Sequence, residues 1–200
     1  MINKKFLIFI PAYNVERKII SVLERIPQKL FSEYSIEILI IDDHSQDNTK
    51  QVAENYINEN LTDKFIHVIK NKVNFGYGGV QKIAFEYAIK NKFDYVIMLH
   101  GDGQYAPEKV PEFISNLLNN DADAVFGSRL INPKDALKGG MPLYKFIGNR
   151  CLTVIQNLIL GTKMSEFHSG YRSFKVEALQ NINFSQNTND FHFDTEIIIQ

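Results

Sequence analysis

Three short apolar runs, each stopping abruptly at a cluster of polar residues, constrain the fold of this chain most strongly. The runs cover residues 6–10, 36–41 and 95–99, and each is long enough for one buried strand. Residues with helical spacing separate them, which predicts an α/β fold with a mostly parallel sheet and helices on both faces. We expect the three polar clusters to meet outside the carboxyl ends of the strands, where open α/β sheets bind ligands.

The same periodicities predict the other elements of a single domain. Further strands are expected at 65–69, 124–127 and 171–174, and helices at 15–30, 47–60, 79–91, 108–120, 142–160 and 175–181. Pro27 should bend or end the first helix. No repeat or linker divides residues 1–200, which indicates one domain. The chain stops inside an uncapped helix, so we expect the protein to continue beyond Gln200.

Charge, cysteine content and hydropathy exclude several classes of function. The net charge of −1 provides no basic field for nucleic acid. Cys151 is the single cysteine, which excludes an intrachain disulfide and favours a reducing compartment. No apolar stretch is long enough for a signal peptide or a membrane span. We therefore expect a cytoplasmic domain, with any membrane association made through parts outside this chain.

The cluster after the third run has the residue types of a metal site. His100, Asp102 and Gln104 occupy alternate positions, so an extended backbone would point all three side chains to one side. Oxygen ligands suit Mg²⁺ or Mn²⁺ carrying a phosphorylated ligand, and the imidazole favours Mn²⁺. The alternative is that Asp102 caps a turn and His100 is an ordinary histidine at the end of a strand.

Asp42 and Asp43 end the second run on opposite sides of the chain. We expect one to face the pocket, where a carboxylate can accept a hydrogen bond from a nucleobase or a ribose, and the other to orient the turn. The alternative is that residues 42–45 only form a turn and a helix cap.

The glycine-rich segment 74–79 precedes a helix. Its backbone N–H groups could approach a diphosphate. It lacks the P-loop pattern, and no Gly-x-Gly-x-x-Gly follows the first strand. These absences argue against a P-loop ATPase and against a dinucleotide-binding enzyme.

Several charged residues in the second half of the chain are candidate site residues. Arg129, Arg150 and Arg172 could contact an anion through planar, bidentate guanidinium groups, or could serve surface and packing roles. Asp194 and Glu196 lie where the last helix starts, which stabilises ionised carboxylates. They could be catalytic or could cap that helix.

Taken together, the ordered motifs resemble family 2 glycosyltransferases with the GT-A fold, a Rossmann-like sheet covered on both faces. The closer resemblance is to the branch of dolichyl-phosphate mannose synthases and polyprenyl-phosphate glycosyltransferases. It spans residues 6–200. The motifs are residues 11–16, 42–49, 74–79, 101–108, 127–129, 169–172 and 193–196.

The resemblance implies metal-dependent transfer of a sugar from a UDP- or GDP-sugar, with inversion at the anomeric carbon, in cell-envelope or polysaccharide biosynthesis. The implied acceptor is a polyprenyl phosphate or a glycan, at the inner face of a membrane. By this resemblance the donor nucleotide contacts Pro11, Ala12, Tyr13, Glu16, Asp42, Asp43, Gly76, Gly79, Gly101 and Asp102. Asp102, Gln104 and His100 would hold Mn²⁺ or Mg²⁺, Arg129, Ser169 and Arg172 the acceptor phosphate, and Asp194 or Glu196 would lie on the acceptor side as catalytic groups.

Two departures from the family pattern bear on activity. His100 stands where the family usually has the first aspartate of an Asp-x-Asp motif, and Glu166 and Phe167 stand where the branch often has Asp-Pro. The first removes a negative charge from the metal site and leaves open a GT-A-like module that binds a nucleotide-sugar without turnover. A nucleotidyltransferase is a third alternative, but residues 11–14 lack the glycine-rich run with a basic residue that such enzymes carry.

The nature of the acceptor decides whether a base is needed. A sugar hydroxyl must lose a proton, which suits Asp194 as a base. A lipid phosphate is already ionised and needs positive contacts, which suits Arg129 and Arg172. The arginine-bearing motifs favour the lipid phosphate.

Overall fold

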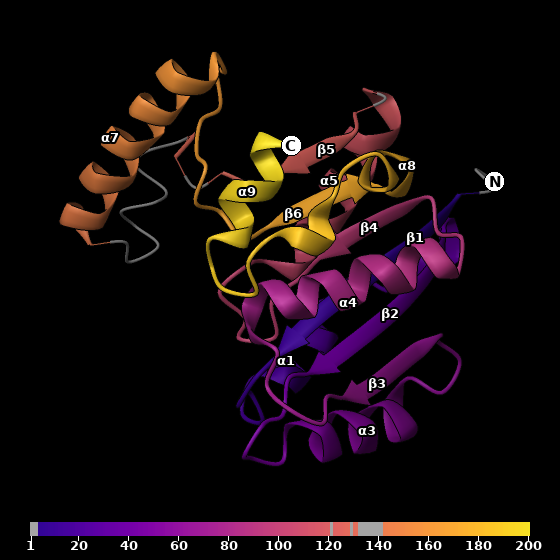
Figure 1. Ribbon diagram of the computed structural model, residues 1–200. Coiled ribbons are helices and arrows are strands. Elements are labelled where there is room, and N and C mark those ends of the chain that lie inside the picture. The colour runs from indigo at the N-terminus through magenta and orange to yellow at the C-terminus, as the bar shows by residue number, and fades with distance from the viewer. Residues whose placement is uncertain (1–3, 121, 129, 132–141) are drawn as a thin grey trace.

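The computed structural model describes residues 4–120, 122–128, 130–131 and 142–200. It contains a six-stranded sheet in the order β3-β2-β1-β4-β6-β5 (Figure 1). The strands are β1 (Lys5–Ala12), β2 (Ser35–Asp42), β3 (Ile66–Lys70), β4 (Tyr95–Met98), β5 (Ala124–Phe126) and β6 (Arg172–Lys175).

Strands β3, β2, β1 and β4 run parallel, whereas β6 runs antiparallel to both of its neighbours. The predicted mostly parallel sheet is therefore confirmed. The register places Ala12 beside Asp42, where β1 and β2 end together. Beyond β4, the Gly101 N–H donates to the Pro11 carbonyl at 3.2 Å. The three polar clusters thus share one edge of the sheet.

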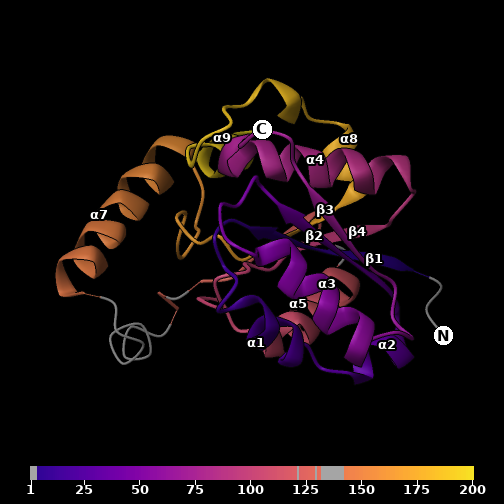
Figure 2. The same cartoon turned by 90° about the horizontal axis from the view of Figure 1, so that it is seen from below.

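Helices cover both faces of the sheet (Figure 2). They are α1 (Ile19–Glu24), α2 (Lys29–Glu33), α3 (Thr49–Asn60), α4 (Gly76–Lys90), α5 (Val110–Asn119), α7 (Leu143–Leu160), α8 (Val176–Gln180) and α9 (Phe193–Ile199), with 3-10 turns at Pro107–Lys109 and Phe184–Gln186. Along β1, Phe6, Ile8 and Ile10 pack with α1, α2, α3 and α5, while Leu7 and Phe9 pack with α4, α8 and α9. The alternation of a strand thus supplies two apolar cores.

Two predicted helices have different bounds in the structure. The helix expected at 15–30 is two short helices, α1 and α2, interrupted around Pro27, whose ring lacks the N–H that a continuous helix needs. The helix expected from residue 79 begins at Gly76, so most of the predicted glycine-rich loop is its first turn.

Helix α7 stands apart from the sheet and the other helices in both views, on the side toward which the parallel strands point (Figures 1 and 2). It is the longest described helix, with 18 residues, and Thr153 is its single buried residue. No helix among the described residues is long and apolar enough to cross a membrane.

Candidate active site

A pocket of about 360 Å³ opens outside the carboxyl ends of β1, β2 and β4. Its described lining consists of Pro11, Ala12, Tyr13, Val15, Asp43, Asn74, Gly76, Tyr77, Val80, His100, Gly101, Asp102, Asp190 and Phe191. Eight of the predicted site residues lie in this lining: Pro11, Ala12, Tyr13, Asp43, Gly76, His100, Gly101 and Asp102. This pocket is therefore the site that the sequence predicts at the edge of the sheet formed by the carboxyl ends of the parallel strands.

Asp43 is the aspartate of the pair that faces the pocket. Its Oδ1 accepts hydrogen bonds from the Asn71 side chain at 2.8 Å and from the Phe75 N–H at 2.9 Å, and its Oδ2 accepts from the Gly76 N–H at 2.9 Å. A carboxylate offers about four acceptor positions, so one position on Oδ2 is left for a ligand donor. Asp43 is thus held rigidly as an acceptor at the pocket wall.

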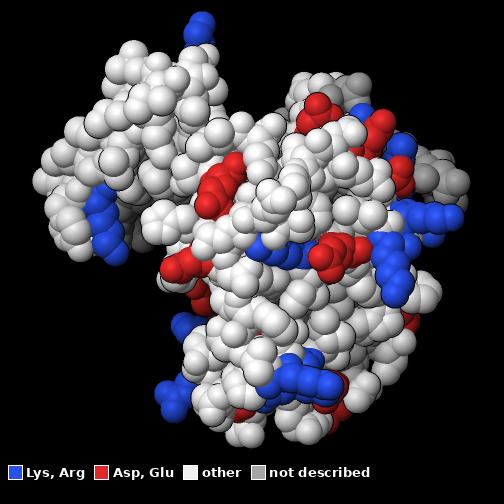
Figure 3. Space-filling model, in the orientation of Figure 1, with Lys and Arg blue, Asp and Glu red and all other residues white. Residues whose placement is uncertain are grey.

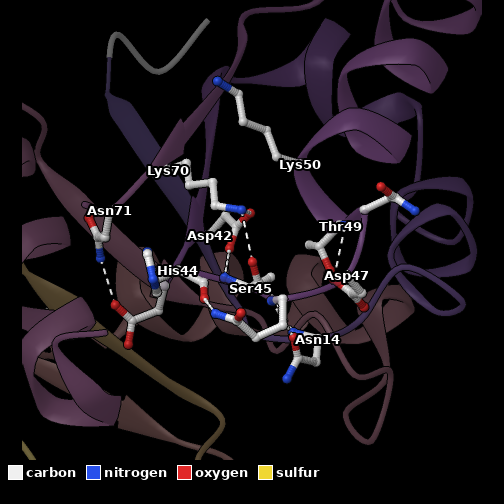
Figure 4. Close-up of polar contacts among 12 residues, drawn as sticks. Asn14, Asp42, His44, Ser45, Asp47, Thr49, Lys50, Lys70 and Asn71 are labelled. Atoms are coloured by element: carbon white, nitrogen blue, oxygen red, sulfur yellow. Dashed lines mark hydrogen bonds and ion pairs between the residues drawn. The ribbon is translucent and has the colours of Figure 1, made fainter. Parts of the chain in front are cut away.

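Asp42 points away from the pocket and orients the turn. It is completely buried, and its Oδ1 accepts the Ser45 N–H at 2.7 Å. Lys70 lies 3.7 Å from its Oδ2, which offsets part of the buried charge (Figure 4). Asp42 lies outside the described pocket lining, because strand alternation aims it into the protein, and its predicted donor contact stays a prediction.

The loops after β1 and β2 are tied together by side chains (Figure 4). Asp47 accepts hydrogen bonds from the N–H groups of Glu16 and Thr49 and from the Thr49 hydroxyl. Burial alone would raise the pKa of Asp47, but these hydrogen bonds outweigh it and lower that pKa. Glu16 accepts the Asn48 N–H at 2.9 Å. Glu16, predicted to contact the donor, thus supports the start of α3 and is absent from the pocket lining.

The predicted metal cluster does not converge, because the chain turns at residues 101–103 and does not continue as a strand. Gly103 has a φ of 72°, a left-handed conformation that breaks the alternation. As a result Asp102 faces the pocket, while the exposed Gln104 lies outside the described lining. The expectation that all three side chains point to one side is therefore wrong.

His100 lines the pocket but is engaged with the segment before β6. Its Nε2 lies 3.1 Å from the Gly170 carbonyl oxygen, so this nitrogen carries the proton and donates. Its ring packs between Tyr77 and Tyr105, with centroids 5.8 and 4.8 Å away. Burial lowers the pKa of His100 despite the nearby charge of Asp102, which favours the neutral ring. A nitrogen that donates to a carbonyl is no metal ligand, so His100 Nε2 does not fill that predicted role.

Asp102 is the residue best placed to hold a metal ion. Its Oδ1 accepts the Gln104 N–H at 2.9 Å, and among the described residues no other hydrogen bond reaches its carboxylate. The described lining contains Asp43, Asp102 and Asp190 and no lysine or arginine. An anionic diphosphate entering this pocket would meet like charge, which a divalent cation would offset. No cluster of three or more histidine, cysteine or acidic residues is arranged for an ion in the part of the chain described, so the remaining ligands would come from the bound molecule and from water.

The N–H groups of Phe75, Gly76, Gly78 and Gly79 are already used within the protein. Those of Phe75 and Gly76 donate to Asp43, and the Gly78 N–H donates to the Asn189 carbonyl at 2.7 Å. A Cβ on Gly78 would lie 2.5 Å from the Thr188 carbonyl oxygen, so glycine is needed for close packing. Gly76 lies in the described pocket lining and Gly79 outside it, and the diphosphate contact of this segment stays a prediction.

Asp194 lies behind the pocket in a polar network. Its Oδ2 accepts the Tyr77 hydroxyl at 3.0 Å and lies 3.3 Å from an Arg172 nitrogen. Its Oδ1 accepts from the Gln81 side chain at 3.0 Å. Asp194 is absent from the described pocket lining. In this conformation it positions Tyr77 and does not reach the pocket as a base.

Arg172 is completely buried and its donors are committed internally. Its Nε donates to the Ser169 carbonyl at 2.8 Å, and its two terminal nitrogens donate to the carbonyls of Asp194 and Phe167 at 2.6 and 3.0 Å. Burial lowers the pKa of Arg172, opposed by the charge of Asp194. Arg172 therefore fixes the segment before β6, and its predicted phosphate contact stays a prediction.

The other predicted acceptor-side residues lie elsewhere. Ser169 is buried and is part of a separate pocket beside α5 and β5. Glu196 accepts the Thr188 N–H at 2.7 Å, which holds the segment before α9. Arg150 is exposed on α7. Arg129 lies outside the described residues.

Six residues of the described lining were not among the predicted site residues: Val15, Asn74, Tyr77, Val80, Asp190 and Phe191. Tyr77 lies within the glycine-rich motif but was not singled out, and Asp190 precedes the aromatic pair at 191 and 193. Phe191 is largely exposed and stacks on Tyr77, with ring centroids 5.0 Å apart. The signal for Phe191 was that aromatic pair, whereas Asp190 has no recognisable local signal.

Comparison with known proteins decides the family of this chain. The sequence profile of Glycosyl transferase family 2 matches residues 7–182, which include β2 to β6 and β1 from Leu7 onward. The chain belongs to glycosyl transferase family 2. The predicted resemblance is thereby confirmed, and the pocket lies within a glycosyltransferase domain.

Two curated proteins similar to this family 2 domain act on lipid phosphates by name. A UDP-N-acetylglucosamine–dolichyl-phosphate N-acetylglucosaminyltransferase from Methanococcus voltae is 30% identical over 189 residues, covering 90% of this chain and 73% of that protein. A polyprenol monophosphomannose synthase from Mycolicibacterium smegmatis is 23% identical, covering 92% of this chain and 66% of the other. This family 2 domain therefore spans about two thirds to three quarters of these relatives.

A solved structure with the same fold supports the architecture. A mannosyltransferase from Pyrobaculum calidifontis, in complex with GDP-Man and Mn²⁺, superposes with a TM-score of 0.63 at 16% identity. The match covers 98% of this chain and 52% of that one. The family 2 domain therefore has the predicted GT-A fold.

Proposed function

We propose that this chain transfers a sugar from a UDP- or GDP-sugar to the phosphate of a polyprenyl phosphate, with inversion and with a divalent metal ion. The observation that carries the proposal is the convergence of residues 11–13, Asp43 and Asp102 on one pocket at the carboxyl edge of a glycosyltransferase sheet. The relatives that act on dolichyl and polyprenyl phosphates support the acceptor class.

The pocket walls suit the two ends of a nucleoside diphosphate. The half-exposed Tyr13 offers a ring for a base to stack on, and Asp43 offers a fixed acceptor for a base N–H or a ribose hydroxyl. Asp102 would hold Mn²⁺ or Mg²⁺, which supplies charge neutralisation for the leaving diphosphate. Gln104 would join it as a ligand only after a rotation of its exposed side chain.

A lipid phosphate as the acceptor is consistent with the ion pair between Asp194 and Arg172. Such a phosphate attacks as an anion and needs no general base, and Asp194 is ion-paired with Arg172. Inversion follows from a single displacement in which the phosphate oxygen bonds to the anomeric carbon as the diphosphate leaves. We place this reaction at the cytoplasmic face of a membrane, where the lipid phosphate would be presented.

A thermal-shift panel of UDP, GDP, CDP and ADP, each with and without Mn²⁺, tests the donor site first. A ligand that binds the folded state raises the melting temperature, so UDP or GDP with Mn²⁺ should raise it and the other nucleotides should not. Transfer from the matching nucleotide-sugar to a short polyprenyl phosphate then tests the reaction. No shift with any nucleotide in a folded sample would contradict the proposal.

A second candidate function is a nucleotide-sugar-binding module without turnover. The engagement of His100 with Gly170, at the position of the usual first aspartate, favours this candidate. Nucleotide binding without transfer to any acceptor and without donor hydrolysis would support it.

A further inference from the structure

Helix α7 exposes a continuous apolar surface, which we call the apolar face of α7. Its members are exposed by 48–79%, values typical of polar side chains on a soluble helix. They are Leu143, Tyr144, Ile147, Leu152, Val154, Ile155, Leu158 and Ile159. At 3.6 residues per turn, six of these positions fall within about a third of the helix circumference, with the exposed Cys151 among them, and Leu152 and Ile159 lie further round, toward Lys145.

The opposite side of α7 faces the rest of the protein and carries polar side chains together with the partly buried Phe146 and Leu160. Thr153 is buried and Asn149, Gln156 and Asn157 are partly buried. Asn157 bonds to both backbone groups of Met164, at 2.8 Å each. A surface helix normally turns its apolar side to the core. In α7 only Phe146 and Leu160 of the large apolar side chains turn inward, so the fold presents the apolar face outward.

The charged residues around the apolar face of α7 favour an anionic lipid surface over a protein as its partner. Residues 143–165 include Lys145, Arg150 and Lys163 and no acidic residue. Lys145 and Arg150 fall at the two borders of the apolar face, where long basic side chains can reach lipid headgroups. A second copy of α7 packed symmetrically on the first would bring the same basic borders together. Figure 3 shows blue side chains and no red ones over this helix.

We propose that α7 lies parallel to the plane of an anionic lipid bilayer, with its apolar face inserted at the boundary between headgroups and acyl chains. This is the arrangement of helices that combine a wide apolar face with basic flanks and are not suited to cross a membrane. The proposal is argued from α7 alone and does not depend on sugar transfer. It places the membrane contact within this chain, on the side of the sheet that holds the pocket (Figure 1).

The single cysteine makes a direct test available. Cys151 lies within the apolar face, so a nitrobenzoxadiazole label there reports insertion. The labelled full chain is mixed with vesicles of phosphatidylcholine containing 30% phosphatidylglycerol, or of phosphatidylcholine alone. We expect a blue-shifted, stronger emission and co-sedimentation with the anionic vesicles. Ionic-strength-sensitive binding should be lost in the variant with both Lys145→Gln and Arg150→Gln.

A matched pair of variants distinguishes insertion of α7 into the bilayer from non-specific adsorption of the protein to vesicles. Leu158→Glu with Ile155→Glu should weaken vesicle binding about tenfold or more, since both side chains lose their place in the acyl boundary. Phe65→Glu, which changes a residue 74% exposed and outside α7, should leave binding unchanged. Unaltered melting temperatures would show that the variants fold. Absence of vesicle binding, equal binding to neutral vesicles, or a dimer that Leu158→Glu dissociates would each overturn the proposal.

Discussion

The Tyr77 hydroxyl donates a hydrogen bond to Asp194 Oδ2 at 3.0 Å, although the two residues are 117 positions apart in the chain. Tyr77 forms part of the pocket wall, whereas Asp194 lies behind it beside Arg172. Burial and the charge of Asp194 raise the pKa of Tyr77, so the hydroxyl keeps its proton and donates. The acidic residue that the sequence offers as catalytic is thus connected to the pocket through one aromatic side chain.

Replacing Arg172 should destabilise the protein strongly. Arg172→Met leaves Asp194 without its cation and several buried carbonyl oxygens without donors. Removing one partner of a buried ion pair costs about 3–5 kcal/mol. Chemical denaturation measures the free energy of unfolding. Arg25→Met is the control, because the Arg25–Glu108 pair is exposed and is worth at most about 1 kcal/mol. Equal losses in the two variants would contradict the network described here.

Gly170 and His100 should be energetically coupled. A Cβ at position 170 would lie 2.6 Å from His100 Nε2 and 3.1 Å from the Tyr77 hydroxyl oxygen, so Gly170→Ala forces the imidazole to move. We expect a loss of about 1–3 kcal/mol in the free energy of unfolding. Combining it with His100→Ala removes the closest obstacle, so the double variant should be more stable than the sum of the single losses predicts. Strict additivity would show that the two residues do not touch.

Nucleotide binding should require a divalent cation and Asp102. Because three aspartates and no lysine or arginine line the described pocket, UDP or GDP alone should bind weakly, and Mn²⁺ alone should lack a complete set of protein ligands. We expect a thermal shift only when both are present, and loss of that shift in Asp102→Asn. Gln104→Ala should retain it, since the Gln104 side chain lies outside the lining. A full shift in Asp102→Asn, or its loss in Gln104→Ala alone, would reverse this assignment.

The edge of the sheet that holds the site was predictable because it depends on local pattern. Each apolar run ends where its polar cluster begins, and strand alternation separates Asp43 from Asp42. Residues 100–104 show the limit of that reasoning. Alternation was extended past the end of β4, but the turn at Gly103 sends Gln104 away from Asp102.

The roles of Arg172 and the glycine-rich segment were not predictable, because distant contacts decide them. The sequence predicts that the Arg172 guanidinium is available for phosphate. In the structure it donates to the backbone carbonyls of Phe167, Ser169 and Asp194. The glycine-rich segment 74–79 was expected to approach a diphosphate, yet its Gly78 packs against Thr188, more than a hundred residues away. The sequence around such a residue does not indicate which distant residue it will contact in the folded protein.

Asp47 should make stability depend on pH in the acid range. Hydrogen bonds to the ionised carboxylate lower its pKa in the folded state below the usual 3.8, so the unfolded chain binds this proton more readily. The contribution of ionised Asp47 to the free energy of unfolding is therefore fully present above about pH 3.8. It is lost as the pH falls through the pKa of Asp47 in the folded state. Asp47→Ala should cost about 1–2 kcal/mol at neutral pH. The difference in free energy of unfolding between Asp47→Ala and the wild type should shrink when denaturation is repeated at decreasing pH below 3.8. Glu33→Ala, which removes an exposed acid, should show neither effect, and a pH-independent difference for Asp47→Ala would assign its loss to packing instead of charge.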